Sequence, residues 1–590
     1  MSQTFDQSSV SDSSPGLQQP DPDVVLVPKL DERFALTRTH MLLVAVGCLF
    51  FMYYNYTRLF HSDFWGHVAY GQWMLANQQL PAQELFVKWA EGVPVVCTAW
   101  LSQVLLGAVS RSGDVEWFSH LFAATMLATY GAFAVTFYRQ TKQWTTAVVC
   151  CLLAWVVIFS RHSIVRPEIF GSLCFAGLSL LLVLSDSVRT RQRGETAEPM
   201  SRKHAIIHWA AVLGLFVLWA NLHGSFIVGY ALLGAYLVGR AVEVLWEKHD
   251  LQEVFRDRLF QQRLIACELA LAGSVLNPYG FDLLIHTLVF PSNPNLTDVW
   301  EWYPLEMVSL EGPFMLFSWV LLLVTLRHSR ARVAASDVVL LSVFTVATCM
   351  RVRMIQWYGP ALLLTLAPHV QDVFARLIPW LKDKDLGETL EWLETRSFRH
   401  TLLTGLMVWI AFCFSPVSVP FLGGSPRDAE HVYSSDTPRE LTEFLKEHPP
   451  RGAIANPQWW GDWLALEGPE GLEVMMTTNA VHVVPPRVWK DYLAIAEGED
   501  GLERRLDHYR INTIVISKSL QAPLYRQTRR LRGWEEVYDD DVGLIVSRDQ
   551  ELIKAAAEAK AAREEGDTTD DEEFEAAQPV AAIFSDAATT

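Results

Sequence analysis

Apolar positions along the chain gather into long runs that short polar segments separate. About eleven of these runs are long enough, or nearly long enough, to cross a bilayer as helices. They lie at about 40–58, 117–138, 144–160, 168–186, 205–221, 225–246, 263–277, 313–327, 335–350, 355–373 and 401–421. The shorter segment 100–110, WLSQVLLGAVS, predicts an amphipathic helix in the membrane interface. The pattern therefore predicts an α-helical polytopic membrane protein.

The pattern changes after the last apolar run. Between about 430 and 550, short strand-like runs alternate with helical patterns, which is typical of a small soluble α/β domain. The expected strands are GAIAN, LEVMMTT, INTIVIS and VGLIVS, and the expected helices are PRELTEFLKEH and EDGLERRLDHY. We therefore divide the chain into a disordered N-terminus (1–35), a transmembrane domain (36–421), an α/β domain (422–550) and an acidic disordered tail (551–590).

Basic residues predict the orientation of the chain in the membrane. Lys and Arg cluster in alternate connections, which the positive-inside rule assigns to the cytoplasm. These connections include 139–142, 188–204, 248–263, 327–332 and 382–399. The first residues lack a basic segment followed by an apolar one, so no cleavable signal peptide is expected. We expect a multi-pass protein of the cytoplasmic (inner) membrane, with a cytoplasmic N-terminus and an extracytoplasmic, periplasmic α/β domain.

Composition narrows the class of protein. The chain has 590 residues, of which 51% are hydrophobic and 12% aromatic, which agrees with a bilayer-embedded body. Its formal net charge of -18 argues against nucleic acid as a partner. Of the 8 cysteines, all but Cys97 fall inside apolar runs, a distribution that indicates neither a disulfide framework nor a zinc site.

Several arginines break the rule that depletes basic residues from short outward connections. These are Arg161, Arg166, Arg351 and Arg353. A guanidinium group matches phosphate oxygens in a bidentate manner and stays charged at any relevant pH. These side chains therefore predict recognition of a lipid-linked phosphate or pyrophosphate. The alternative is contact with lipid headgroups or pairing with Glu168 and other acids.

The first outward connection also holds acids and an imidazole, namely Asp63, His67 and Glu84. A carboxylate in this place could take a proton from an acceptor hydroxyl, and two acids with a histidine could hold a divalent cation. The alternative is that Asp63 solvates a helix end and Glu84 a surface turn. His223, in the turn NLHG, could contact substrate or form a structural hydrogen bond.

Seven short motifs follow one another along the chain. They are Asp63-Phe64-Trp65-Gly66-His67, Leu80-Pro81, Gly92-Val93-Pro94, Arg166-Pro167-Glu168, Asn221-Leu222-His223-Gly224, Asn277-Pro278-Tyr279-Gly280 and the run 459–464, WWGDWL. This order resembles that of bacterial GT-C type membrane glycosyltransferases, in an uncharacterised branch of the protein mannosyltransferase and aminoarabinose transferase-like superfamily.

The resemblance implies a GT-C-like membrane domain and a set of roles. Asp63 would be the general base that activates the acceptor, and His67 and Glu84 would be auxiliary or metal-binding groups. Substrate and phosphate binding would fall to Arg161, Arg166, Arg351, Arg353 and His223. The donor would be a polyprenyl-phosphate-linked sugar held at the membrane lipid. The sequence leaves the acceptor open, and it suggests no cofactor beyond a divalent metal.

Departures from the family pattern leave a second function open. Just before Trp100, where such relatives often carry a carboxylate, this chain has Cys97-Thr98-Ala99. The alternative is therefore a catalytically inactive GT-C-fold envelope protein or a transporter of lipid-linked saccharides. A transporter would predict charged residues deep within spans and repeat symmetry, and the sequence shows neither.

Overall fold

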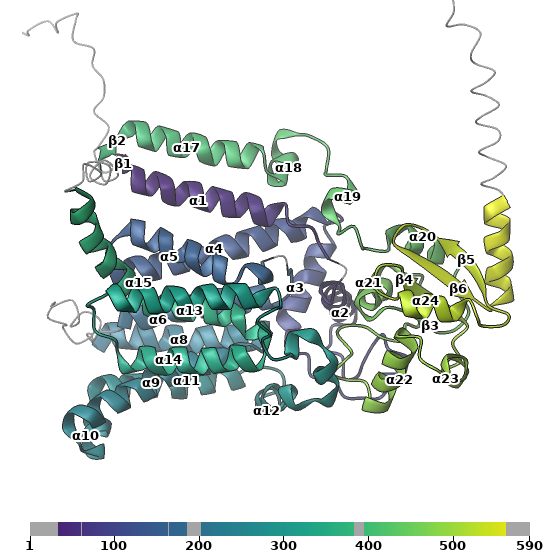
Figure 1. Ribbon diagram of the computed structural model, residues 1–590, viewed down its shortest axis with the longest axis horizontal. Helices are drawn as coiled ribbons and strands as arrows, with labels where there is room; N and C mark the ends of the chain where they lie inside the picture. Colours follow the sequence, from purple (N-terminus) through teal and green to yellow (C-terminus); the bar gives the residue numbers. More distant parts are fainter. Residues whose placement is uncertain (1–33, 61, 163, 186–201, 383–394, 562–590) are drawn as a thin grey trace, which may run out of the picture.

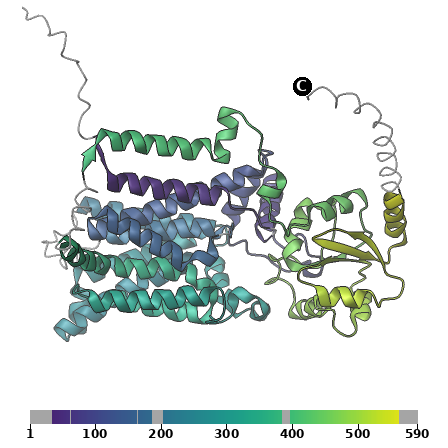
Figure 2. The ribbon, with the colours of Figure 1, turned by 45° about the horizontal axis from the view of Figure 1, so that its top comes forward.

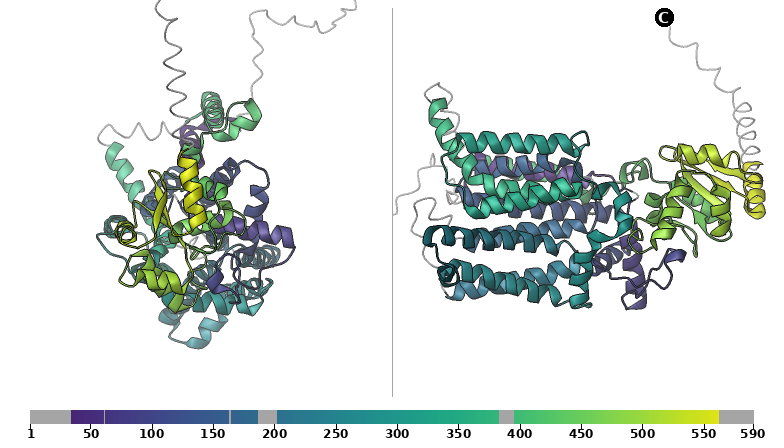
Figure 3. Two further views of the ribbon diagram at one scale, coloured as in Figure 1. Left: turned by 90° about the vertical axis from the view of Figure 1, so that its right-hand side faces the viewer. Right: turned by 60° about the horizontal axis from the view of Figure 1, so that its bottom comes forward.

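The computed structural model describes residues 34–60, 62–162, 164–185, 202–382 and 395–561. A long bundle of helices occupies one part of the molecule, and a small α/β unit is attached to one end of it (Figure 1). The α/β unit projects along the bundle axis in the other views as well (Figure 3).

The bundle consists of helices that follow the apolar runs of the sequence. They are α1 (Arg38–Asn55), α4 (Glu116–Thr141), α5 (Trp144–Val157), α6 (Glu168–Ser185), α8 (Arg202–Leu222), α9 (Phe226–Lys248), α11 (Arg258–Val275), α13 (Glu311–His328), α14 (Ala335–Met350), α15 (Ile355–Lys382) and α17 (Phe398–Cys413). A helix satisfies its own backbone hydrogen bonds, which is why apolar runs in a membrane adopt this structure. Every predicted run coincides with one of these helices.

The number of membrane crossings is a separate matter from the number of helices. Within the described ranges, 4 helices are long and apolar enough to cross a membrane, namely α4, α6, α8 and α9. The count rises to 5 if α17 and the bent segment Pro416–Leu422 form one span. These helices indicate a membrane protein, while the larger number of spans stays a prediction.

The first and last helices of the bundle are held together at their N-terminal ends. Strand β1 (Leu36–Thr37) pairs antiparallel with β2 (Arg396–Ser397), directly before α1 and α17 respectively. The two helices then run side by side (Figure 2). This clasp lies at the bundle end remote from the α/β unit (Figure 1).

The α/β unit contains a four-stranded sheet in the order β3-β4-β6-β5. The strands are β3 (Ile454–Ala455), β4 (Thr513–Ser517), β5 (Glu535–Asp539) and β6 (Gly543–Ser547), and the helices are α20 (Arg439–Glu447), α21 (Gln458–Glu467), α22 (Pro486–Ala496), α23 (Leu502–His508) and α24 (Ala522–Thr528). β3 and β4 are parallel, whereas β6 is antiparallel to both of its neighbours. Every residue of β4 and β6 is buried, as expected for the central strands of a covered sheet.

Two features of this unit differ from the sequence predictions. The segment LEVMMTT is not a strand and forms only isolated bridges, from Val474 to Val87 and Ile454. Two backbone hydrogen bonds join this segment to β3, from the Ile454 N–H to Glu473 and from the Met475 N–H to Ile454. The pairing stops there, where the side chain of Asn456 accepts hydrogen bonds from the N–H groups of Met475 and Met476. The charged edge strand β5 has no apolar alternation and was not predicted.

The ends of the chain fit the predicted division only in part. Residues 550–561 form a helix beyond the sheet, within the segment 551–590 for which the sequence analysis expects disorder, and their Ala, Glu and Lys residues favour a helix. Of the segments predicted to be disordered, 1–35 and 551–590, residues 1–33 and 562–590 lie outside the described residues. The domain limits at 36, 422 and 551 remain predictions.

Two short helices lie where the bundle meets the α/β unit. They are α2 (Phe64–Asn77) and α3 (Trp100–Ser110), the second being the predicted interfacial helix (Figure 1). They cross very closely, since a Cβ atom at Gly71 would lie 1.8 Å from the carbonyl oxygen of Gln103. α2 also packs against α21, so it joins the bundle to the α/β unit.

Candidate functional site

Asp63 occupies the position directly before α2, but its side chain does not cap that helix. Its Oδ1 atom lies 2.7 Å from Nε of Arg166, and the Asp63 side chain is only 17% exposed. The alternative that Asp63 merely solvates a helix end therefore does not describe this side chain. It is held in an ion pair at the bundle end that faces the α/β unit.

Glu301 joins Arg166 to a second arginine. Nη1 of Arg166 donates to Oε1 and Oε2 of Glu301 at 2.9 and 3.1 Å, and Nη1 of Arg161 donates to Oε1 at 3.1 Å. Burial raises the pKa of Glu301, but the charges of Arg166 and Arg161 outweigh burial and hold this pKa well below its usual range. Burial likewise opposes the charge of Arg166, yet Asp63 and Glu301 raise its pKa. The charged forms therefore persist at neutral pH.

Glu168 extends the network to a third arginine. Nη2 of Arg161 and Nη2 of Arg353 each lie 3.6 Å from a Glu168 oxygen. The Arg353 guanidinium also lies 4.8 Å from the ring centroid of Trp302, in a cation–π contact. Arg161 and Arg353 are thus both paired with Glu168 in this structure. The sequence left such pairing open as an alternative to phosphate binding.

Arg351 stands apart from this network. Its Nη1 atom donates to the carbonyl oxygen of Met350, and the ion pairs of the described residues include none to Arg351. Arg351 ends α14 in an extended conformation, before the turn Val352–Met354 that carries Arg353. Of the two candidates from this connection, the structure brings Arg353 to the other arginines.

The candidate histidines are half-buried and neutral. His67 lies on α2 with Nδ1 3.0 Å from Nε2 of Gln103, and burial lowers its pKa to about 4. Nδ1 of His223 accepts a hydrogen bond from the Ser225 N–H, and burial lowers the pKa of His223 to about 4 as well. Both rings therefore act as neutral hydrogen-bonding groups at pH 7.

Both carboxyl oxygens of Glu84 accept hydrogen bonds, one from α2 and one from its own loop. Its Oε2 accepts a hydrogen bond from the Tyr70 hydroxyl at 2.6 Å, and its Oε1 accepts one from the Phe86 N–H at 3.1 Å. Burial raises the pKa of this carboxyl group. The contact ties the loop to α2, so the structure supports a positioning role for Glu84.

The residues proposed for a metal do not fit one. Both oxygens of Glu84 already accept hydrogen bonds, and Nδ1 of His67 is occupied by Gln103. Across the described part of the chain, no group of three His, Cys, Asp or Glu side chains is arranged to hold a metal ion. We therefore derive no step of the chemistry through a metal.

Two acidic residues of this region were not predicted from the sequence. Glu301 lies between Trp300 and Trp302, in an aromatic segment of the kind that marks a membrane interface. Asp462 belongs to the WWGDWL run of α21 and is 1% exposed. A signal was present in each case, since an acid stands among aromatic residues in a segment expected outside the membrane.

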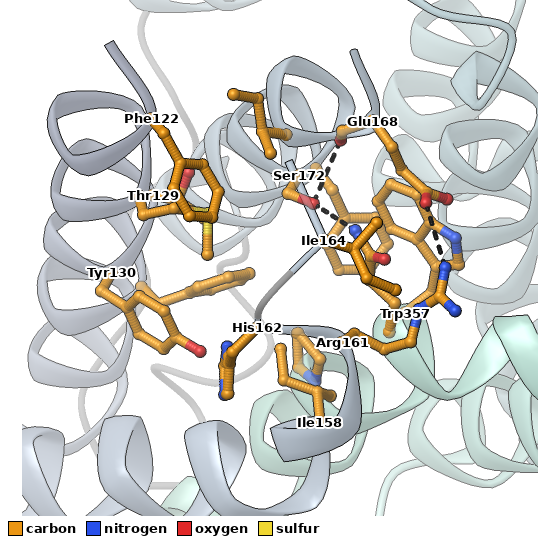
Figure 4. Close-up of a pocket in the computed structure, with 16 residues that line it drawn as sticks. Phe122, Thr129, Tyr130, Ile158, Arg161, His162, Ile164, Glu168, Ser172 and Trp357 are labelled. Atoms are coloured by element: carbon orange, nitrogen blue, oxygen red, sulfur yellow. Dashed lines mark hydrogen bonds and ion pairs between the residues drawn. The ribbon is translucent and has the colours of Figure 1, made fainter. Parts of the chain in front are cut away.

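An apolar pocket lies inside the bundle beside the arginine network. It is bounded by α4, by the connection before α6, by the first turns of α6, and by the start of α15. Figure 4 shows Arg161 and Glu168 on one side of this pocket and Phe122 and Tyr130 on the other. The pocket therefore combines apolar walls with a charged edge.

Comparison with known proteins identifies the fold but not the family. No family model matches the chain, and no curated protein matches it in sequence. The structure is similar to the apo crystal structure of the Archaeoglobus fulgidus oligosaccharyltransferase, with a TM-score of 0.50 and 12% identity over 86% of this chain and 74% of that one. A second structure of that enzyme, tethered with an acceptor peptide containing the NVT sequon, gives a TM-score of 0.45 and 11% identity over 87% and 74%.

The first of these similarities concerns a glycosyltransferase with the GT-C fold. The predicted GT-C-like fold is therefore confirmed at the level of overall architecture. The bacterial branch, the donor and the acceptor remain outside what a similarity at this identity shows.

Proposed function

We propose that this protein is a membrane glycosyltransferase that moves a sugar from a polyprenyl-phosphate donor to an extracytoplasmic acceptor. The observation that carries the proposal is the contact between Asp63 and Arg166, in a network that also contains Arg161 and Arg353. Three carboxylates, those of Asp63, Glu168 and Glu301, and three guanidinium groups thus meet at the bundle end beside the α/β unit. This combination supplies both a proton acceptor and cationic groups for a departing phosphate.

In the proposed reaction, Asp63 accepts the proton of an acceptor hydroxyl group. The acceptor oxygen forms a bond to C1 of the sugar while the bond from C1 to the phosphate oxygen breaks. The sugar carries oxocarbenium-like charge in such a transition state, and the electron pair of the broken bond leaves with polyprenyl phosphate. The products are the glycosylated acceptor and the lipid phosphate.

Arg161 is suited to the departing phosphate. Its Nε and Nη2 atoms are buried and have no hydrogen-bond partner among the described residues, although Nη2 lies in the longer ion pair with Glu168. Unsatisfied guanidinium N–H groups in a buried place favour an incoming anion.

The alternative, a GT-C-fold protein without catalytic activity, also has an observation in its favour. Glu168 and Glu301 already pair with the arginines and compensate much of their charge. A phosphate would have to compete with these carboxylates. Direct measurement of transfer separates the two functions.

The test reconstitutes the full chain in liposomes with labelled polyprenyl-phosphate sugars and a panel of lipid, glycan and peptide acceptors. Asp63→Asn should reduce transfer by about a hundredfold or more, the usual contribution of a general base. Glu91→Gln, which changes an exposed acid of the same connection, should leave transfer unchanged. Undiminished transfer by Asp63→Asn would remove Asp63 as the base, and no transfer from any donor by the unaltered protein would favour the inactive alternative.

A further inference from the structure

Asp462 places a buried carboxyl group where the α/β unit meets α2. Its Oδ2 accepts a hydrogen bond from the Thr478 N–H at 2.7 Å. Its Oδ1 is buried and has no hydrogen-bond partner in the described chain. An unpaired buried carboxyl oxygen is costly, so its position requires an explanation.

Oδ1 of Asp462 lies close to the backbone of Gly66 in α2. A Cβ atom at Gly66 would lie 2.0 Å from Oδ1 of Asp462 and 2.9 Å from Nδ2 of Asn479, so only a glycine permits the approach. Gly66 follows Asp63 by three residues, and residues at this spacing share one side of a helix. The Asp462 carboxyl group therefore contacts the first turn of α2 close to Asp63.

The surrounding contacts make this junction firm. The Trp65 ring packs edge-on against Trp463 at a centroid distance of 5.0 Å, and it also contacts Tyr433. Leu59, just before α2, forms a backbone bridge with Tyr433. The α/β unit thus contacts the chain both before and after Asp63, at Leu59 and at Trp65.

We propose that Asp462 is a positioning residue for Asp63: its carboxyl group seats the first turn of α2 against the α/β unit and thereby holds Asp63 beside Arg166. Asp462 itself touches neither the network arginines nor the pocket described above. This inference rests on the proposed function for its activity measurements, but its stability measurement stands without that function.

The contact requires the neutral form of Asp462. Burial, with the charges of Asp63 and Glu84, raises the pKa of Asp462 to about 8. The cation Arg166 is paired with Asp63, while His67 and His482, whose pKa values burial lowers to about 4, are neutral. Ionisation of Asp462 above pH 8 would therefore place an uncompensated negative charge against α2.

The sign of the pH effect follows from these two states. An aspartate in the unfolded chain ionises near pH 4, about 3.9 in model peptides, whereas Asp462 in the folded protein stays neutral until about pH 8. Its contribution to stability is full below the first value and is lost progressively as pH rises to the second. Asp462→Asn, a neutral isostere, removes this dependence.

The experiment compares Asp462→Asn, Asp462→Ala and the control Asp541→Asn, an exposed acid of the same unit, in the full chain. The difference in thermal midpoint between Asp462→Asn and the unaltered protein should grow in favour of the variant from pH 4 to pH 8 and stay constant above pH 8. The midpoint of Asp541→Asn should equal that of the unaltered protein at every pH. Transfer by Asp462→Asn should persist above pH 8, where the unaltered protein declines. Asp462→Ala should lose about a hundredfold in kcat at every pH, the effect of a small misplacement of a reacting group.

Two outcomes would overturn the inference. One is an Asp462→Asn protein whose midpoint and transfer follow the same pH profile as the unaltered protein. The other is an Asp462→Asn protein that does not fold, because the amide should replace a neutral carboxyl group. If no variant transfers any sugar, the proposed function fails, while the stability profiles still decide the role of Asp462.

Discussion

Two buried carboxyl groups flank Asp63 and have opposite electrostatic surroundings. Glu301, on the bundle side, is 5% exposed, and Asp462, on the side of the α/β unit, is 1% exposed. Arg166 and Arg161 hold the pKa of Glu301 below its usual range, whereas burial among acids raises the pKa of Asp462 to about 8. Burial is nearly equal, so the presence or absence of a cation decides the charge. The two sides of the site should therefore fail in different ways when altered.

The largest effect is expected on the charged side. Glu301→Gln leaves Arg161 and Arg166 buried without their shared counter-ion, and breaking a buried pair in this manner typically costs about 3–5 kcal/mol. The free energy of unfolding in detergent should fall by this amount, whereas Glu306→Gln, at an exposed acid nearby, should change little. Equal stability of the two variants would show that the network is not electrostatically coupled.

An intermediate effect is expected on the neutral side. Gly66→Ala drives a methyl group into the space of the Asp462 carboxyl, and overpacking of this kind costs about 1–3 kcal/mol. Gly131→Ala, at a helical glycine with open space around it, should be neutral or slightly stabilising. If both substitutions had the same effect on the thermal midpoint, the close approach of Asp462 to α2 would be disproved.

The smallest effect is expected from a comparison of Arg353 with Arg351, two arginines of the same connection. Arg353→Ala loses the ion pair with Glu168 and the cation–π contact with Trp302, for about 1 kcal/mol. Arg351→Ala should stay within about 0.5 kcal/mol, as is usual for a substitution without such contacts. In a transfer assay, only Arg353→Ala should raise the KM for the lipid-linked donor. A rise for Arg351→Ala alone would reverse the assignment.

The sequence predicted the helices well because long apolar runs allow no other regular structure in a membrane. It also put Asp63, Arg161, Arg166 and Arg353 on one side of that membrane, and the structure brings these four into one network. Their roles stay a proposal. The grouping was accessible because charge in short connections is a local property of the sequence.

Partners that come from distant segments could not be predicted in this way. Glu301 meets Arg161 across an interval of several helices, and Asp462 meets Gly66 across almost the whole bundle. No local periodicity encodes such encounters. The same limit applies to Glu84, whose oxygens are occupied by Tyr70 and Phe86 only because the loop folds back on α2.

The pairing of β1 with β2 bears on the order in which the protein is made. α1 precedes the other helices of the described bundle along the chain, and the helix that covers its flank, α17, is synthesised only after the rest of that bundle. Until α17 emerges, α1 must therefore keep that flank against lipid or against an insertion factor. The clasp can close once α17 has been made, before the α/β unit is synthesised, so it marks the completion of the bundle.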